Sequence, residues 1–292
     1  GWYFGFGYFL FSLYWIAISL TFDQSFKFLI PFTIVLLPAF LAIFYGLMTC
    51  LFSIFYSKNV VVSFFIFSIL FGTTEFLRGS ILTGFPWNLI SFSFSNSTYF
   101  IQVLSIIGTY SFNLICISLF TVPALFILRN SRIEIMVCFF FIIISAAFLI
   151  FGYTKNNNFN SLESINNSYT IKAISPNISL DRFYSKGDEL KIINELIELS
   201  VPTKIKPTIF LWPEGIISDS YLKDMSIYKN LFLNNFGEHD LIIVGLNSIE
   251  TKNGKNLFFN SMAIFNNKLD LISKYNKVNL VPFGEFIPFE NI

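Results

Sequence analysis

The stretch "EIMVCFFFIIISAAFLIFGYTKNNNFNSLESINNS" (134–168) joins two parts of the chain that differ sharply in composition. Residues 134–153 are almost entirely apolar, whereas residues 154–168 are rich in Asn and Ser. An apolar run of about 20 residues is long enough to cross the ~30 Å hydrocarbon core of a bilayer as a helix. The stretch therefore predicts a membrane-spanning helix that is followed by a polar linker.

Four more apolar runs precede this one, at 1–20, 28–56, 60–77 and 99–128. Residues 1–153 contain only eight Asp, Glu, Lys or Arg side chains. Helices on the surface of a soluble protein need a charged outer face, which these runs lack. We therefore expect residues 1–153 to form a transmembrane domain with five helices.

The basic residues of the connections predict an orientation. If the chain starts on the inside, the inside connections contain Lys58, Arg129 and Arg132. Short connections rich in Lys and Arg stay on the cytoplasmic side of bacterial membranes. The fifth span is then expected to deliver the polar remainder of the chain to the outside.

Residues 169–292 have the composition of a soluble domain. Strands are predicted at 169–175, 207–214 and 241–247, helices at 185–200 and 221–235, and a hairpin across Asn266-Asn267. Strands that alternate with helices indicate an α/β domain. The fold class is thus a multi-span helical membrane bundle, a linker at 154–168 and an α/β domain at 169–292.

Several functions are excluded by composition. The formal net charge of +1 does not favour nucleic-acid binding, which needs a basic face. The chain has one His, and its Cys residues show no metal-ligand spacing, so an ordinary zinc site is excluded. The three cysteines, Cys50, Cys116 and Cys138, all lie within apolar runs.

Two segments of the polar part contain candidates for acid–base chemistry. Glu214 follows the apolar strand and Trp212-Pro213, where open α/β sheets place their ligands, and could act as a general base. Lys277 ends the hairpin, and the turn around Phe283 can bring Glu285 back beside it. A lysine in a water-poor pocket stabilises an oxyanion. The alternatives are a helix-terminal or solvated carboxylate for Glu214 and a surface ion pair for Lys277.

The connection at 78–100 is aromatic and contains Gly and Pro, as a segment lying at the membrane interface would. Trp87 is either an ordinary interfacial anchor or a contact for a lipid substrate. Glu75 and Arg78 are spaced i, i+3 at the end of a span and can form a structural ion pair.

The motifs "LWPEG" (211–215), "NLFFNSMAIF" (256–265) and "KYNKVNLVPFGEFIPFE" (274–290) together resemble the nitrilase superfamily. That superfamily has an αββα domain with a Glu–Lys–Cys triad. The five preceding spans and "TGFPWN" (83–88) make the chain similar to the apolipoprotein N-acyltransferase family within it. The resemblance implies that Glu214 is the general base, that Lys277 stabilises the intermediates and that Glu285 is a supporting acid. It makes Trp87 and Phe283 candidates for contact with lipid, and it implies no cofactor.

The resemblance also implies a reaction. An acyl chain would move from a membrane phospholipid, through a cysteine thioester, to the N-terminal amine of a diacylglyceryl-cysteine lipoprotein. The protein would lie in the bacterial inner membrane with its catalytic domain on the periplasmic side.

In the family the nucleophilic cysteine lies downstream of the "PFGEF" turn, and this sequence has no cysteine after Cys138. We therefore expect a chain truncated at its C-terminus and by two spans at its N-terminus, and inactive as it stands. The alternatives are a membrane-tethered amidase of the nitrilase type and a non-catalytic membrane scaffold.

Overall fold

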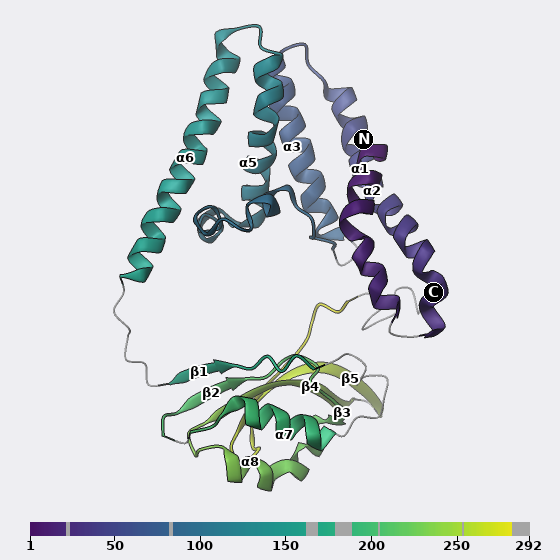
Figure 1. Cartoon of the computed structure of the whole chain (residues 1–292). Helices are drawn as coiled ribbons and strands as arrows, with labels where there is room; N and C mark the ends of the chain where they lie inside the picture. The colour runs from purple at the N-terminus through teal and green to yellow at the C-terminus, as the bar shows by residue number, and fades with distance from the viewer. Residues whose placement is uncertain are drawn as a thin grey trace. The chain divides into compact units, whose positions relative to one another are not determined.

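The computed structural model describes residues 1–21, 24–81, 84–161, 169–178, 189–203, 205–252 and 254–281. The chain divides into two compact units, residues 1–163 and residues 164–292 (Figure 1). Each unit is described separately below.

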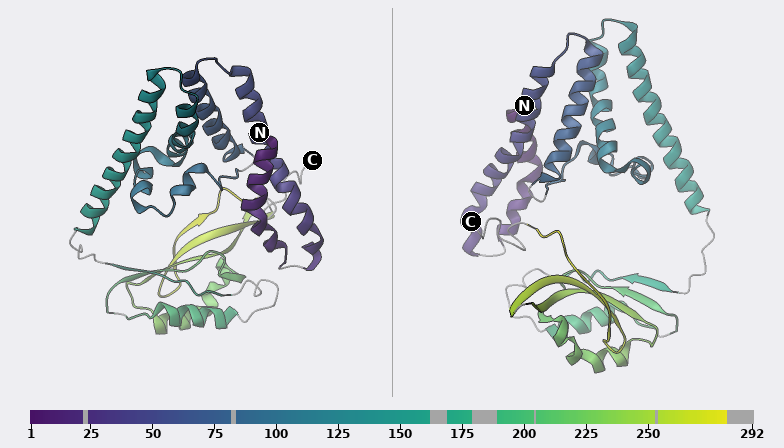
Figure 2. Two further views of the ribbon diagram at one scale, coloured as in Figure 1. Left: turned by 45° about the horizontal axis from the view of Figure 1, so that its top comes forward. Right: turned by 180° about the vertical axis from the view of Figure 1, so that it is seen from behind.

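The described residues of the first unit form helices and the connections between them. Its elements are α1 (Trp2–Leu13), η1 (Tyr14–Thr21), η2 (Gln24–Leu29), α2 (Ile30–Phe55), α3 (Val60–Arg78), η4 (Ile90–Phe94), α4 (Thr98–Ile101), α5 (Leu104–Ile127) and α6 (Arg132–Asn160). Helix α1 packs along α2, and α3 packs against both α2 and α5 (Figure 2).

Five helical segments of the described residues are long and apolar enough to cross a membrane: Trp2–Thr21, Gln24–Phe55, Val60–Arg78, Leu104–Ile127 and Arg132–Phe159. The prediction of five spans is confirmed. The fourth span begins later than expected, at Leu104, because the short helix α4 precedes it. Helix α6 continues to Asn160, beyond the apolar run and into the stretch expected to be a linker.

Local signals explain where two of these helices begin. The Asn59 side chain accepts a hydrogen bond from the Val62 amide (3.2 Å) and so caps α3. Ser131 and Glu134 form a capping box at the start of α6. In each helix a side chain thereby binds one of the N-terminal amides that have no partner within the helix.

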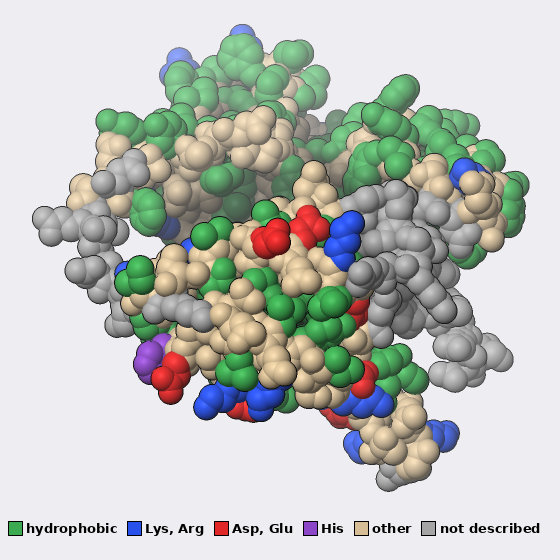
Figure 3. Space-filling view, turned by 60° about the horizontal axis from the view of Figure 1, so that its bottom comes forward, with side chains coloured by type: hydrophobic (Ala, Val, Ile, Leu, Met, Phe, Trp, Pro, Cys, Tyr) green, Lys and Arg blue, Asp and Glu red, His purple; other side chains and the backbone are tan. Residues whose placement is uncertain are grey.

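The outer surface of the first unit is apolar. Along α6 the exposed side chains include Met136, Phe139, Ile143 and Ile150, which recur at helical spacing. Figure 3 shows hydrophobic side chains covering the helices of this unit, whereas charged side chains are spread over the other unit. An apolar exterior of this extent is typical of a surface that contacts lipid.

The second unit is built on one mixed sheet. Its elements are β1 (Thr170–Ala173), α7 (Glu189–Ser200), β2 (Thr208–Leu211), β3 (Ile217–Tyr221), η6 (Leu222–Tyr228), α8 (Lys229–Asn235), β4 (Leu241–Lys252), β5 (Lys255–Asn266) and β6 (Leu271–Asn276). The strand order is β1-β2-β4-β5-β6, and β3 pairs with β4. Strands β1, β2 and β4 are parallel, whereas β4, β5 and β6 are antiparallel.

Helices α7 and α8 cover one face of this sheet (Figure 1). The core between the two layers contains Ile193 and Leu196 of α7, Phe210 of β2, and Ile242 and Val244 of β4. This arrangement confirms the predicted α/β class for the polar part of the chain.

The strands of the β4–β5 hairpin are longer than the sequence pattern predicts. Strand β4 continues to Lys252, and its pairing with β5 runs from Leu241↔Asn266 to Lys252↔Lys255. Strand β3 was not expected, and the helix expected at 221–235 begins as the 3₁₀ helix η6. The expected hairpin across Asn266-Asn267 is present as β5 and β6.

Candidate active site

Glu214 lies in the turn that follows β2. Trp212, two residues before it, is buried and anchors the turn. The Trp212 amide donates to the Ile243 carbonyl (2.8 Å), and its indole Nε1 donates to the Ser200 hydroxyl (3.0 Å). A buried indole needs such a partner, because an unpaired N–H in the core is costly. The two bonds fix Trp212, and therefore the point at which the chain leaves β2 and turns toward Glu214.

The turn crosses the neighbouring strand β4 at Gly245. A Cβ atom on Gly245 would lie 2.6 Å from the Glu214 Cα and 3.0 Å from the Gly215 nitrogen. Gly215 has φ +63°, a left-handed conformation that favours glycine. Both glycines are therefore required for the carboxylate to pass over β4.

Asn260 of β5 and Lys277, directly after β6, complete the cluster. The Asn260 side-chain amide donates to Glu214 Oε1 (2.8 Å), and Lys277 Nζ lies 3.2 Å from the same oxygen. The Lys277 backbone amide donates to the Asn260 carbonyl (2.8 Å). Asn260 thus contacts both ionisable residues, one through its side chain and the other through its backbone.

The ion pair is open to solvent on one side. The side chain of Glu214 is 65% exposed and that of Lys277 is 31% exposed. A carboxylate beside an ammonium group can take a proton from a nucleophile, while the ammonium group stabilises an oxyanion that forms nearby. The exposure leaves room for a substrate to reach both groups.

A second polar cluster lies close by in the sheet but on its other face. The Ser248 and Ser261 hydroxyls are 2.7 Å apart, Ser261 donates to Asn276 (2.8 Å), and Asn276 donates to Glu250 (3.0 Å). Successive side chains of a strand point to opposite faces, so Ser261 and Asn260 are separated by the sheet. Lys274 donates to Glu250 (2.5 Å) and, together with Asn276, lowers the pKa of that carboxylate. Glu250 is therefore ionised at neutral pH and does not share the Glu214 site.

The other predicted site residues fall into two groups. Phe283 and Glu285 lie outside the described residues. Trp87 belongs to the first unit, is 46% exposed, and stacks on Trp15 with ring centroids 5.2 Å apart.

The cysteines are all in the first unit, Cys50 in α2, Cys116 in α5 and Cys138 in α6. In the part of the chain that the structure describes, no group of three His, Cys, Asp or Glu side chains could hold a metal ion.

Sequence reasoning gave no role to Asn260 or Gly245. Asn260 and Ser261 are the two polar residues in the otherwise apolar stretch "LFFNSMAIF" (257–265), which is a sequence signal for Asn260. Gly245 had a signal too, because a glycine inside a strand often marks a close backbone approach.

Comparison with known proteins gives a consistent result for the whole chain. Residues 1–122 match the family model described as the apolipoprotein N-acyltransferase N-terminal domain. Three curated relatives, from Rhizobium rhizogenes, Rhizobium etli and Rickettsia prowazekii, are each named apolipoprotein N-acyltransferase. They are 29%, 30% and 31% identical over 302, 305 and 305 aligned residues, which include 100% of this chain.

The same alignments cover 56%, 56% and 58% of the respective relatives, so the chain spans little more than half their length. Within that span, the chain is similar along its entire length to proteins named apolipoprotein N-acyltransferase, and its residues 1–122 match the model of that family's N-terminal domain.

Proposed function

We propose that these residues belong to a phospholipid:apolipoprotein N-acyltransferase in which Glu214 is the general base and Lys277 stabilises the oxyanion. The observation that carries the proposal is the cluster itself, in which Lys277 Nζ and the Asn260 amide both lie within 3.2 Å of Glu214 Oε1. The five apolar spans and the similarity to the named relatives support a reaction between lipid-anchored substrates.

The first half-reaction forms a thioester. Glu214 takes the proton from a cysteine thiol, and the sulfur attacks the ester carbonyl of a membrane phospholipid. Lys277 stabilises the tetrahedral oxyanion, a contribution of about 3–4 kcal/mol for a single well-placed donor. The intermediate collapses by breaking the ester C–O bond, and the proton held by Glu214 passes to the departing lysophospholipid.

The second half-reaction forms an amide. The free α-amine of a diacylglyceryl-cysteine attacks the thioester, Lys277 again stabilises the oxyanion, and the thiolate leaves. The amine proton goes to Glu214 and then returns to the sulfur. Transfer through a covalent intermediate divides one difficult step into two easier ones. The reaction needs a thiol near Glu214, and the sheet unit contains no cysteine within residues 1–292, because Cys50, Cys116 and Cys138 all belong to the helical unit.

The membrane helices suit this chemistry. Moving one acyl chain out of the bilayer costs about 0.8 kcal/mol per CH₂, so both substrates stay membrane-bound during transfer. We place the protein in the bacterial inner membrane with the sheet unit on the periplasmic side. Lys58 and Arg129 support this orientation, because both line one pocket at the same end of the bundle.

The test uses the complete open reading frame that contains these residues, purified in phospholipid vesicles with a diacylated lipopeptide. We expect a triacylated product by mass spectrometry, and we expect Glu214→Gln and Lys277→Met to abolish it. Glu238→Gln, a change of an exposed loop carboxylate, is the matched control and should leave the rate unchanged. Residues 1–292 alone are expected to give no product, because no cysteine accompanies Glu214.

Three results would contradict the proposal. Free fatty acid or ammonia in place of the N-acyl product would indicate an amidase that uses water. Full activity in both variants would remove the Glu214–Lys277 pair from the mechanism. No turnover from the complete reading frame on either substrate would favour a membrane scaffold.

A further inference from the structure

The first unit contains an ion pair that is completely buried. The side chains of Glu75 and Arg78 are both 0% exposed, and Arg78 Nη2 lies 3.1 Å from Glu75 Oε1. The Tyr45 hydroxyl donates to the same oxygen (3.0 Å), and the Arg78 guanidinium lies over the Phe9 ring at 5.2 Å. Charged groups are rarely found at such depth in a membrane protein without a specific task.

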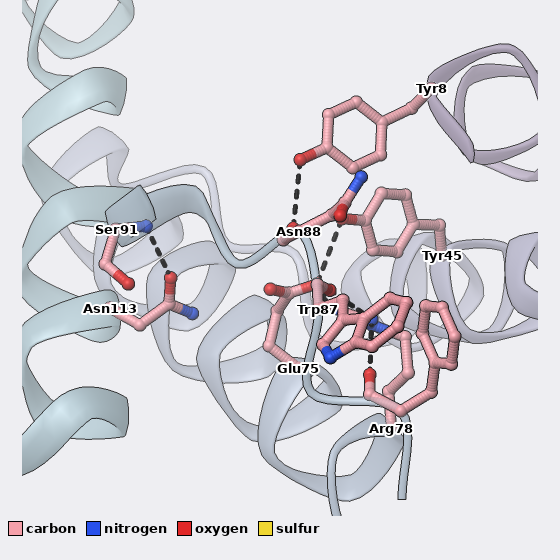
Figure 4. A network of polar contacts seen from close by, with 9 residues as sticks. Tyr8, Tyr45, Glu75, Arg78, Trp87, Asn88, Ser91 and Asn113 are labelled. Carbon is pink, nitrogen blue, oxygen red and sulfur yellow. Dashed lines mark hydrogen bonds and ion pairs between the residues drawn. The ribbon is translucent and has the colours of Figure 1, made fainter. Parts of the chain in front are cut away.

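The other terminal nitrogen of Arg78 binds two backbone carbonyls. Its Nη1 donates to the Phe85 carbonyl (2.7 Å) and to the Trp87 carbonyl (2.8 Å). In Figure 4 the Trp87 indole is drawn in front of the guanidinium, with the Glu75 carboxylate and the Tyr45 hydroxyl close to the same group. A planar guanidinium can hold a carboxylate and two carbonyls at once, whereas an ammonium group has no such fixed fork.

The connection from 85 to 91 is also tied to two other helices. The Tyr8 hydroxyl of α1 donates to the Asn88 carbonyl (2.9 Å), and the Ser91 amide donates to the Asn113 side chain of α5 (2.9 Å). Side chains from α1, α3 and α5 therefore bond to backbone groups along one short irregular segment (Figure 4).

The start of this connection is sterically constrained as well. A Cβ on Gly79 would lie 1.9 Å from the Tyr110 hydroxyl, and one on Gly84 would lie 2.2 Å from the Gly79 carbonyl oxygen. Gly84 has φ +83° and Asn88 has φ +59°, so two residues of the segment are in the left-handed region. Such a conformation persists only where surrounding contacts hold it.

Trp87 of this segment and Trp15 of η1 form an aromatic pair on the surface of the helical unit. Trp87 is 46% exposed and Trp15 is 45% exposed, and their rings are stacked at 5.2 Å. Exposed tryptophans at the ends of spanning helices are typical of the boundary between headgroups and acyl chains.

We propose that Glu75 and Arg78 are a positioning pair that fixes residues 85–91 and thereby holds Trp87 at the lipid interface. The carboxylate orients the guanidinium, the guanidinium holds the Phe85 and Trp87 carbonyls, and the indole ring is placed at a defined depth. This inference goes beyond the proposed acyl transfer and does not depend on it.

The experiment compares the parent protein with Arg78→Lys in phosphatidylcholine vesicles. Lysine keeps the charge but cannot hold the carboxylate and both carbonyls together. We expect amide exchange in peptides covering 84–91 to become about 10-fold faster or more, while peptides within 30–55 and 132–159 keep their protection. Arg129→Lys is the matched control: Arg129 is exposed, lies just after α5, and donates to the Phe126 carbonyl in the last turn of that helix.

A spectroscopic measurement separates positioning from general stability. The signal of Trp87 is obtained as the difference between each protein and its Trp87→Phe version. In the parent, lipids brominated near the carboxyl end of the acyl chain should quench this signal more strongly than lipids brominated near the methyl end. In Arg78→Lys that depth preference should be lost, whereas it should persist in Arg129→Lys.

Three outcomes would overturn the proposal. One is unchanged exchange at 84–91 in folded Arg78→Lys, and another is an unchanged depth preference of Trp87. A third is faster exchange throughout the unit, which would make the pair a general stabiliser of the bundle. If Arg78→Lys does not fold, Glu75→Gln decides, because it removes the carboxylate charge that orients the guanidinium and must speed exchange at 84–91.

Discussion

Two ion pairs among the residues that the structure describes have nearly equal separations and opposite surroundings. In the helical unit Arg78 and Glu75 are 3.1 Å apart and both side chains are fully buried. In the sheet unit Lys277 and Glu214 are 3.2 Å apart, with exposed fractions of 31% and 65%. The carboxylate of the first pair is enclosed by protein, whereas that of the second faces solvent. An ion pair that water can reach contributes little to stability and is available to a substrate, while a buried one is committed to structure.

The largest expected effect comes from Glu214→Gln in the complete protein. Loss of a general base lowers a rate by about 10²- to 10⁴-fold, whereas loss of an exposed ion pair changes stability by about 1 kcal/mol or less. Steady-state acyl transfer and the melting temperature of the same sample test both halves of this prediction. A large fall in the melting temperature of Glu214→Gln would contradict this prediction, because it would show that the exposed pair stabilises the fold as the buried pair does.

The second prediction removes one charge of the buried pair. Glu75→Gln leaves the Arg78 charge in the bundle without its counter-ion, and breaking a buried pair in this way costs about 3–5 kcal/mol. Reversible unfolding of the helical unit in mixed micelles measures the loss. Arg129→Gln, at an exposed position, should cost less than 1 kcal/mol in the same assay.

The third prediction concerns Gly245→Ala, a change that displaces Glu214 from Lys277 but keeps both charged side chains. Gly245→Ala places a Cβ 2.6 Å from the Glu214 Cα, so the turn must shift, at a cost of about 1–3 kcal/mol. We expect acyl transfer to fall further than stability, because Glu214 leaves Asn260 and Lys277. Gly7→Ala is the control, since a Cβ on Gly7 meets no atom within 4 Å. Equal activity in the two alanine variants would contradict the close approach at Gly245.

The smallest effect concerns a third pair, Lys274 and Glu250, whose exposed fractions are 22% and 46%. The hydrogen bonds from Lys274 and Asn276 hold the pKa of Glu250 below its ordinary value of 4.5. A carboxylate with a lowered pKa stabilises the fold above its unfolded pKa, and this contribution disappears as pH falls through the folded value. We expect a slight loss of stability below about pH 4.5 that Glu250→Gln removes. Urea titrations at pH 7 and pH 3 measure the loss, and a pH response that is identical in Glu250→Gln would argue against this pair.

Elements with long, regular patterns were predictable from the sequence. The five spans follow from apolar length, and the strands before Trp212 and at 241–247 follow from short apolar runs. The continuation of α6 was not predictable from composition, because its last turns are polar. Lys155 in those turns donates to the Ser105 hydroxyl (2.6 Å), a tertiary contact with α5. The β4–β5 hairpin did have a local signal, Asn253-Gly254, and Gly254 has φ +75°.

The site was only partly predictable for a similar reason. Glu214 and Lys277 stand out as charged residues at the ends of apolar strands, and the structure brings them together. Their catalytic roles stay predictions. Asn260 is marked in the sequence only as a polar residue in an apolar stretch, and its contact with Glu214 could not be predicted, because that contact depends on how β2, β4 and β5 are ordered in the sheet. The buried environment of Glu75 and Arg78 depends likewise on helices far apart in the sequence.

Asn260 links the acid and the amine through different groups, its side-chain amide to Glu214 and its carbonyl to the Lys277 amide. The spacing between base and cation is consequently set by a residue that carries no charge. A side chain one methylene longer or shorter at this position would change the distance between Glu214 and Lys277, although both residues would still be present. Asn260 is therefore the position at which the spacing between Glu214 and Lys277 can be changed without removing either charge.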